Sequence, residues 1–213
     1  MSHLIVTIAR QYGSGGREIG EEVARLLGCR AYGNELITMA AERGDLHEES
    51  LRRVDEVSAG SLLYTLAMGS NMHGIHTPTH LHTPLNDRLF FLQSDIIREI
   101  AEREDAVLIG RCADYVLEGY APLLRVFIYA NEECRIRRIM ERHAIPEGKA
   151  ADLMRKTDNR RANYYNFYTG RKWGQQETYD LSVNSSLLGV ADSAKMIADF
   201  ALALRYRREQ ADD

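Results

Sequence analysis

The sequence predicts an α/β fold in which a parallel sheet of five strands lies between two layers of helices. Short apolar runs rich in β-branched residues alternate with longer amphipathic segments along the 213 residues. Because strands that alternate with helices pair in parallel, both faces of such a sheet are covered. A glycine-rich turn at residues 13–16 joins the first apolar run directly to an amphipathic segment. The length suits a single domain with a substantial core.

Five short runs are the expected strands of this sheet. The first is rich in β-branched residues, which is typical of a buried parallel strand. The apolar runs at 106–109 and 124–130 carry the strongest strand pattern. The expected strands are residues 4–9, a run beginning at 31–32, 106–109, 124–130 and 180–184.

The first helix is expected directly after the glycine turn. Its buried face would hold four apolar residues at spacings of four, three and one: Ile19, Val23, Leu26 and Leu27. Gly28 is placed to end this helix as a C-cap. Further helices are expected at 35–43, 48–66 with interruptions, 88–103, 114–118, after the N-cap Asn131, and 190–207.

Residues 69–87 interrupt the helical pattern with glycine and proline. Four histidines lie in this stretch: His73, His76, His80 and His82. Their spacings of three, four and two permit metal binding, but no cysteine or nearby carboxylate cluster accompanies them. A polar loop is the favoured interpretation.

Composition and charge limit the classes of partner. The net charge is −4, and charges of both signs are well mixed, which argues against general binding to nucleic acid or to an anionic membrane. No apolar stretch approaches transmembrane length, and the short N-terminal apolar run lacks a signal-peptide pattern. Cys29, Cys112 and Cys134 are odd in number and form no C-x-x-C motif. They are expected to be reduced, mostly buried thiols of a cytoplasmic protein.

The glycine turn has the layout of a phosphate-binding loop, but it departs from the consensus G-x-x-x-x-G-K-[ST]. With Gly15 as the last glycine, Arg10 stands at the first glycine position. Gly16 stands at the lysine position and Arg17 at the Ser/Thr position. Backbone N–H groups of Gly13, Gly15 and Gly16 can still turn toward an anion at the start of the helix. The alternative is a tight turn that serves packing alone.

Arg10 and Arg17 flank this loop, and either could supply the missing positive charge. Arg17 is favoured because the first turn of a helix is a poor place for an uncompensated cation. The alternative for each is a solvated surface arginine.

Other arginines are placed to bind anions. Arg111 follows a buried strand, at the carboxyl end where open α/β sheets bind ligands, although it could instead cap a loop by hydrogen bonds to carbonyls. A charged segment follows, and such runs are usually solvated helix faces. Around a phosphate they would neutralise a transferring group and could close over it. Its members are Arg135, Arg137, Arg138, Arg142, Arg155, Lys156, Asp158, Arg160, Arg161, Arg171 and Lys172.

Taken together, these motifs resemble nucleoside monophosphate kinases, specifically the divergent cytidylate kinase-like family of P-loop proteins. The resemblance covers essentially the whole chain. It rests on "ARQYGSGGREIG", "YGNELI", "VLIGRCADYVL", "ECRIRRIMER", "DNRRANYYNFYTGRKWG" and "YDLSVN", all in order.

The resemblance implies a three-layer α/β/α P-loop fold, with an insert that binds the acceptor and an arginine-rich lid. The core would comprise residues 1–44, 88–143 and 176–213. The helical insert would span about 45–87 and the short lid about 144–175. All of these form one domain, residues 1–213.

The resemblance also implies roles for residues that match the family's motifs. The loop "GSG" falls on residues 13–15, and the Gly-Arg that grips the acceptor phosphate falls on Gly110 and Arg111. Cys112 stands where the family has an aspartate, and Asp114 is the nearest substitute.

An Asp-x-x-Arg pair that contacts base and phosphate matches Asp158 and Arg161. The family's further arginine is replaced by Met154, with Arg155 adjacent. These partial matches leave the preference for cytidine open.

The expected activity is phosphoryl transfer from ATP with Mg²⁺ to CMP, dCMP or a related acceptor, driven by positioning and electrostatics. The expected catalytic residues are Arg17, Arg160 and Arg161. The expected donor site comprises Arg10, Gly13, Ser14, Gly15, Gly16, Arg17, Glu18, Arg138 and Arg142. The expected acceptor site comprises Arg111, Asp114, Arg155, Asp158 and Arg161.

Two alternatives stay open. One is a nucleotide-binding protein of the same fold with little or no kinase activity, because the loop lysine and the hydroxyl after it are missing. The other is a kinase for a different small metabolite. The metal ligands and the oligomeric state cannot be assigned from the sequence.

Overall fold

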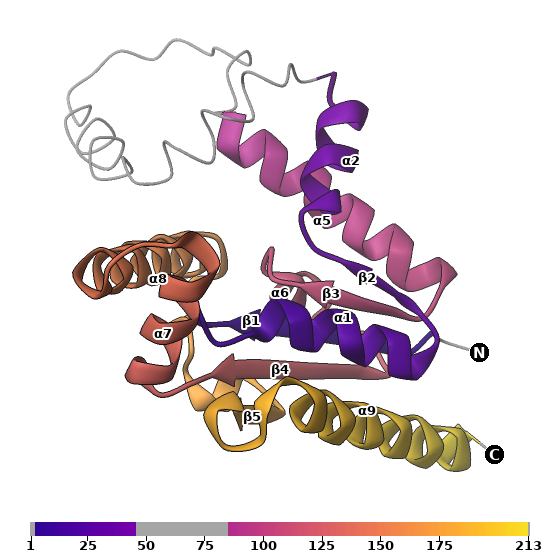
Figure 1. Cartoon of the computed structure of the whole chain (residues 1–213). Coiled ribbons are helices and arrows are strands. Elements are labelled where there is room, and N and C mark those ends of the chain that lie inside the picture. The colour runs from indigo at the N-terminus through magenta and orange to yellow at the C-terminus, as the bar shows by residue number, and fades with distance from the viewer. Residues whose placement is uncertain (1–2, 46–84, 213) are drawn as a thin grey trace, which may run out of the picture.

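The computed structural model describes residues 3–45 and 85–212. Five parallel strands form one sheet in the order β2-β3-β1-β4-β5, with helices on both faces (Figure 1). The strands are β1 Ile5–Arg10, β2 Arg30–Tyr32, β3 Ala106–Ile109, β4 Leu123–Tyr129 and β5 Leu181–Asn184. All five expected strands are confirmed, each within one residue at either end.

The expected helices that fall within the described residues are present in the expected order. The described helices are α1 Gly16–Leu27, α2 Glu35–Arg43, α5 Leu85–Arg103, α6 Ala113–Val116, α7 Glu132–His143, α8 Glu147–Thr169 and α9 Ser185–Asp212, with a short 3-10 helix at Gln176–Thr178. Helix α8 is a further helix that was expected only as part of a charged segment. The expected lid segment contains α8, a single helix of 23 residues. The C-terminal helix begins five residues before its expected start, and the non-helical Gly189 interrupts it.

The expected insert, residues 45–87, lies mostly outside the described residues. The helix expected at 48–66 and the four histidines from His73 to His82 lie outside the described residues. Residues 85–87 were expected to be irregular, but they form the first turn of α5.

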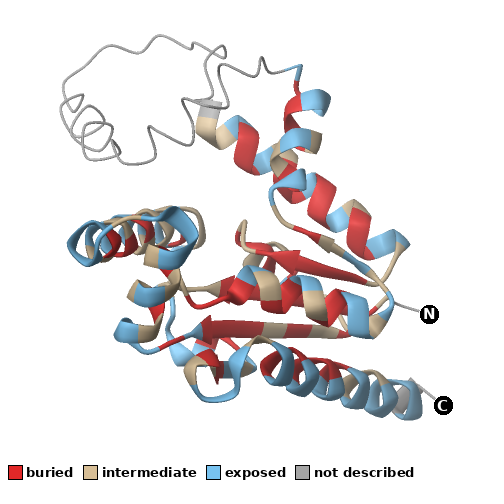
Figure 2. Cartoon of the chain, in the orientation of Figure 1, coloured by how far each residue is buried: buried red, intermediate tan, exposed pale blue. Residues whose placement is uncertain are grey.

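Successive side chains along a strand point alternately to the two faces of the sheet, so the hydrophobic core has two main parts, one on each face. Val6 and Ile8 of β1 point to the face covered by α1 and α9. Ile5 points to the opposite face, which α2, α5 and α6 cover. Figure 2 shows the buried residues gathered along the strands and on the inner sides of these helices. This alternation follows from the two-residue period of a strand.

The expected face of α1 is wrong at Leu26, which is 40% exposed. The buried stripe instead runs through Ile19, Gly20, Val23 and Ala24. Because the small residues Gly20 and Ala24 belong to the buried stripe, its centre lies about one residue further around the helix than expected. Leu26 therefore lies at the edge of the stripe. A Cβ on Gly20 would lie 2.8 Å from Cδ1 of Ile109, so the glycine lets α1 approach the sheet closely.

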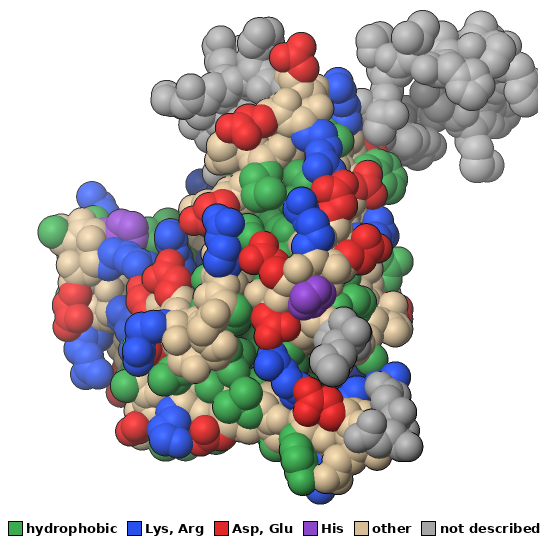
Figure 3. Space-filling model, turned by 90° about the vertical axis from the view of Figure 1, so that its right-hand side faces the viewer, with side chains coloured by type: hydrophobic (Ala, Val, Ile, Leu, Met, Phe, Trp, Pro, Cys, Tyr) green, Lys and Arg blue, Asp and Glu red, His purple; other side chains and the backbone are tan. Residues whose placement is uncertain are grey.

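The mixed surface charge fits the expectation from the sequence, whereas the burial of the cysteines fits it only at one of three positions. Acidic and basic side chains are interspersed over the face shown in Figure 3. No described helix combines the length and apolar character needed to cross a membrane. All three cysteines are free, but only Cys112 is buried; Cys29 and Cys134 are partly exposed.

Ile8 is fully buried in the central strand, so its truncation tests the assignment of the core. We expect Ile8→Ala to lower the free energy of unfolding by about 3 kcal/mol, because it leaves a cavity between β1 and α1. The matched control is Leu187→Ala, at a residue that is 79% exposed; it should change stability by less than about 0.5 kcal/mol. Urea unfolding followed by circular dichroism measures both, and equal losses would contradict the assignment.

Candidate functional site

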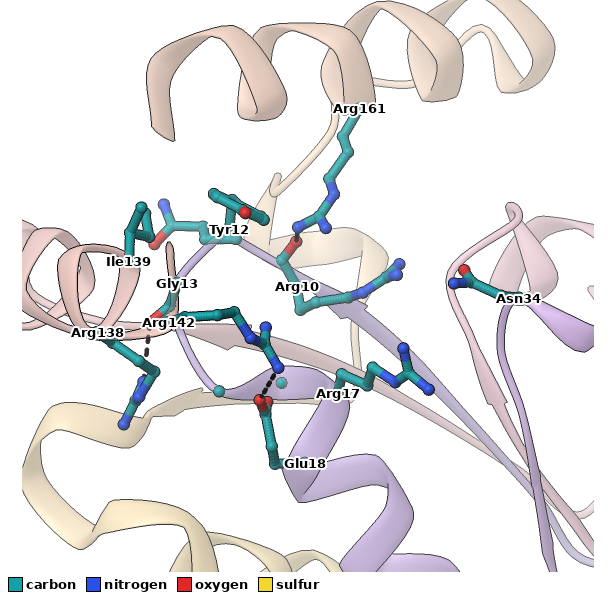
Figure 4. A pocket seen from close by; sticks show the side chains of 13 residues that line it. Arg10, Tyr12, Gly13, Arg17, Glu18, Asn34, Arg138, Ile139, Arg142 and Arg161 are labelled. Carbon is teal, nitrogen blue, oxygen red and sulfur yellow. Dashed lines mark hydrogen bonds and ion pairs between the residues drawn. The ribbon is translucent and has the colours of Figure 1, made fainter. Parts of the chain in front are cut away.

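A pocket of about 230 Å³ lies at the carboxyl end of β1 (Figure 4). This is the edge at which open α/β sheets bind ligands. The residues that line it are Arg10, Gln11, Tyr12, Gly13, Gly15, Gly16, Arg17, Glu18, Asn34, Arg138, Ile139, Arg142 and Arg161. They include every residue of the expected donor site except Ser14.

The loop backbone can adopt its shape only with glycine at two positions. Gly13 and Gly15 have φ of 78° and 76°, a region that favours glycine. A Cβ on Gly13 would also lie 2.8 Å from the carbonyl oxygen of Arg135. Because α1 begins at Gly16, free backbone N–H groups gather at the pocket, as in helix N-termini that bind phosphate.

Two serine hydroxyls hold the loop from behind. Ser14 is fully buried, and its hydroxyl donates to the carbonyl oxygen of Gln11 at 2.8 Å. Ser185, the first residue of α9, donates its hydroxyl to the carbonyl oxygen of Ser14 at 2.6 Å. Ser14 therefore shapes the loop with its side chain and takes no part in lining the pocket.

A buried ion pair fixes the loop at Tyr12. Nε of Arg135, on α7, donates to the carbonyl oxygen of Tyr12 at 2.7 Å. The backbone N–H of Tyr12 donates to Oδ1 of Asp158, on α8, at 2.7 Å. Arg135 and Asp158 also pair with each other, and their side chains are 8% and 18% exposed. Both backbone groups of Tyr12 are thus held by one pair from two helices.

Arg10 is the last residue of β1 and reaches across the pocket. A Cβ on Gly110 would overlap its Nη1 atom, so the guanidinium lies against the end of β3. Nη1 of Arg161 donates to the carbonyl oxygen of Arg10 at 2.9 Å. Desolvation, followed by the positive charges of Arg161, Arg111 and Arg17, holds the pKa of Arg10 well below its ordinary value.

Arg161 lies in the same cluster of cations, above the loop. Its guanidinium sits 5.5 Å from the ring centroid of Tyr12, in a cation–π contact. Burial lowers the pKa of Arg161 to about 10, although the nearby charge of Asp158 opposes this shift. Charges of one sign in a partly dehydrated pocket favour the binding of an anion.

The remaining donor-site residues lie at the rim or under the loop. Arg17 is half exposed, and its Nε donates to Glu21 at 2.8 Å. Arg142 pairs with Glu18 at 2.6 Å. Nη1 of Arg138 donates to the carbonyl oxygen of Gly13 at 2.8 Å, so this arginine supports the loop.

The expected acceptor residues are only partly brought together. Arg111 lies close enough to Arg10 for its positive charge to lower the pKa of Arg10. It follows Gly110 at the end of β3, and the three residues from Gly110 to Cys112 all have a left-handed backbone conformation. A non-glycine residue in this region costs about 1–3 kcal/mol, and such strain is found at functional sites. Asp158 lies nearby, but its carboxylate is bound to the loop.

Asp114 and Arg155 lie away from the pocket. Asp114 is buried and accepts a hydrogen bond from the hydroxyl of Tyr165 at 2.6 Å. Arg155 is exposed on α8 and pairs with Asp152 at 2.7 Å. Arg160, one residue before Arg161, also lies on α8 and does not line the pocket. Substrate contacts of these three residues stay predictions.

Sequence reasoning missed several residues of the site. Tyr12, Asn34 and Ile139 line the pocket, and Ser185 supports the loop. One signal for this support is present in the sequence: the spacings of three and four between Arg135, Arg138 and Arg142 place them on one face of a helix. Two of these arginines, Arg135 and Arg138, bind carbonyl groups of the loop.

The described residues do not fit a protein-held magnesium ion. The usual hydroxyl ligand is replaced by Arg17. Glu18 pairs with Arg142, and Glu35 accepts a hydrogen bond from the backbone N–H of Gly33. Within residues 3–45 and 85–212, no three metal-ligating side chains come together. Magnesium that arrives with a nucleotide would therefore depend on phosphate and water oxygens.

Removing Asp158 should release the loop and leave Arg135 buried without its partner. We expect Asp158→Ala to lower the free energy of unfolding by about 3 kcal/mol. Asp152→Ala is the matched control on the same helix, because Asp152 is 78% exposed in its pair with Arg155; its effect should stay below about 0.5 kcal/mol. Equal effects of the two variants in urea unfolding would show that the buried pair does not fix the loop.

The stability of the protein should depend on the ionisation of Asp114. Burial, opposed by the hydrogen bond from Tyr165, raises the pKa of Asp114 above its ordinary value of 3.8. The folded state therefore holds this proton more tightly than the unfolded chain, and the associated stability is lost as the pH rises through the raised pKa. Asp114→Asn removes the titration, so its stability relative to the wild type should increase between pH 3 and pH 7. Urea unfolding across this range measures the difference, and a constant difference would contradict the prediction.

The chain is similar to several known proteins over most of its length. The chain is 24% identical over 214 residues to a cytidylate kinase of Pyrobaculum aerophilum, with 97% of this chain and 98% of that protein covered. A crystal structure of an uncharacterized protein from Eubacterium ventriosum is 25% identical, with a TM-score of 0.68 over 93% of this chain and 98% of the other. A gluconokinase from Sinorhizobium meliloti shares the fold, with a TM-score of 0.50 at 17% identity over 95% of each chain.

The sequence profile of the cytidylate kinase-like family matches residues 5–187. This range holds the loop, the end of β3 with Arg111, the three helices that carry pocket arginines (α1, α7 and α8) and all five strands. The protein therefore belongs to the cytidylate kinase-like family.

Proposed function

We propose that this protein transfers a phosphoryl group from ATP to a nucleoside monophosphate, with CMP or dCMP as the leading acceptor. The observation that carries the proposal is the pocket itself. It combines a glycine loop, the N-terminus of α1 and several arginines at the carboxyl end of the central strand. Family membership supports a phosphotransferase, and the relative from Pyrobaculum aerophilum is a cytidylate kinase.

In this proposal the loop binds the donor. Backbone N–H groups of Gly13, Gly15 and Gly16 would cradle the β-phosphate of ATP, helped by the positive end of the α1 dipole. Magnesium would accompany ATP and lower the repulsion between its phosphates. Arg17, Arg142 and Arg160 would add positive charge from the rim and from α8.

The acceptor would lie between the ends of β3 and α8. Arg111 and Arg161 would hold its phosphate in line with the γ-phosphate of ATP, which is the positioning that phosphoryl transfer requires. The arginines would offset charge as it develops, so no strong general base is needed. Contact of Asp158 with the base would require this carboxylate to leave Tyr12.

A second candidate is a nucleotide-binding protein with little turnover. The specific observation in its favour is the loop, which has Gly16 in place of lysine and Arg17 in place of the hydroxyl. A kinase for another small metabolite is the third candidate.

The three free thiols fit a reducing compartment, so we place the protein in the cytoplasm.

A coupled assay of ADP release with CMP, dCMP, UMP, AMP and gluconate as acceptors tests the proposal. We expect turnover with CMP or dCMP. Arg111→Ala should lower kcat/KM for that acceptor by about 10- to 100-fold, because a charge-assisted contact is worth about 1.5–3 kcal/mol. Arg98→Ala, on the exposed side of α5, should leave the rate unchanged.

The other candidates give different results in the same assay. Absence of ADP release with every nucleoside monophosphate would overturn the proposal. Binding of ATP and CMP in calorimetry without turnover would then favour the nucleotide-binding protein, whereas ADP release with gluconate alone would favour the third candidate.

A further inference from the structure

The two ends of the phosphate loop exclude each other's side chains. A Cβ built on Gly16 would lie 2.5 Å from Cβ and 2.9 Å from Cγ of Arg10. Carbon atoms that are not bonded to each other prefer separations of about 3.5–4.0 Å. Only one of these two positions can therefore carry a side chain while the loop keeps its shape.

The sequence uses this pair of positions in the reverse of the consensus order. The consensus has glycine at the first position of the loop and lysine at the seventh. This chain has Arg10 at the first and Gly16 at the seventh. The two differences thus amount to one exchange. The cationic residue stands at the first position of the loop instead of the seventh, and glycine stands at the seventh position, where a side chain would collide with Arg10.

The guanidinium of Arg10 lies in the pocket, against the end of β3. There it lies against Gly110, next to Arg111 of the proposed acceptor site. Figure 4 shows the side chain extending from the end of β1 across the pocket toward Asn34. Arg10 therefore lies between the donor loop and the acceptor arginine.

Arg10 and Arg17 differ in their partners. Arg17 is half exposed and bound to Glu21, whereas Arg10 is desolvated and the positive charges of Arg161, Arg111 and Arg17 lower its pKa. A partly dehydrated cation beside other cations is destabilised unless an anion lies next to it. A bound phosphate would be that anion.

We propose that Arg10 takes the place of the loop lysine and binds the β- and γ-phosphates of ATP. This inference rests on the proposed function. During transfer, the bond between the γ-phosphorus and the β,γ-bridging oxygen breaks, and the phosphorus bonds to an oxygen of the acceptor phosphate. The bridging oxygen leaves with its electron pair as part of ADP, and a dianionic acceptor phosphate gives up no proton. Arg10 offsets the negative charge on the phosphate oxygens.

Variants at positions 10 and 16, made singly and together, test the proposal. Arg10→Ala should lower kcat by about 10²- to 10³-fold and weaken ATP binding at least tenfold. Gly16→Lys alone should be equally inactive, because the new side chain collides with Arg10. The double variant R10G/G16K removes the collision and returns a lysine, so it should recover activity to within about tenfold of the wild type. Arg25→Ala, on the exposed side of α1, is the control.

Calorimetry with ATP and thermal melting without ligand accompany the assay, so that misfolded variants are recognised. A folded double variant that is no more active than Gly16→Lys would overturn the exchange, as would Arg10→Ala with the ATP affinity of the wild type. Loss of activity in Arg17→Ala but not in Arg10→Ala would assign the role to Arg17. If the wild type has no turnover, the proposed function fails, while loss of ATP affinity in Arg10→Ala and its return in the double variant still support the site.

Discussion

The ion pair between Arg135 and Asp158 determines how the pocket is assembled. It holds both backbone groups of Tyr12 and joins α7 and α8 to the loop. Without it, the N–H and C=O of Tyr12 would have to find other partners in a partly buried place, at a cost of about 1–3 kcal/mol each. The positions of Arg138, Arg142 and Arg161 depend on the same two helices, so one contact orders most of the positive charge of the site.

The pocket concentrates positive charge on a protein whose net charge is −4. Five of its 13 lining residues are arginines, and Glu18 is its single carboxylate among the described residues. The overall charge therefore gives no indication of the local potential. A field of this kind attracts a polyanion at close range and is screened beyond about 8 Å at physiological ionic strength.

The strands and most helices could be predicted from the sequence because their signals are local. Runs such as residues 4–9 have one stable arrangement as buried parallel strands. The face of α1 was misplaced at Leu26 because Gly20 and Ala24 carry little apolar signal, although small residues suit a close approach to the sheet. Most residues expected around the loop do line the pocket, because residues 10–18 are contiguous in the sequence, and their role in binding a donor stays a prediction.

The contacts among distant residues could not be predicted. Asp158 and Tyr12 are 146 residues apart, and no spacing rule indicates that a carboxylate on α8 binds the loop backbone. Likewise, the choice between Arg10 and Arg17 depended on a steric relation across the loop that becomes visible only in three dimensions.

The mutual exclusion of side chains at Arg10 and Gly16 also bears on how such a loop can evolve. A single change at position 16 produces a collision, and a single change of Arg10 to glycine removes the cation. If Arg10 replaces the loop lysine as proposed, each one-step intermediate would be impaired, and the effects of changes at the two positions would not be additive. A search pattern that requires lysine at the seventh position would overlook a loop whose cation is attached six residues earlier.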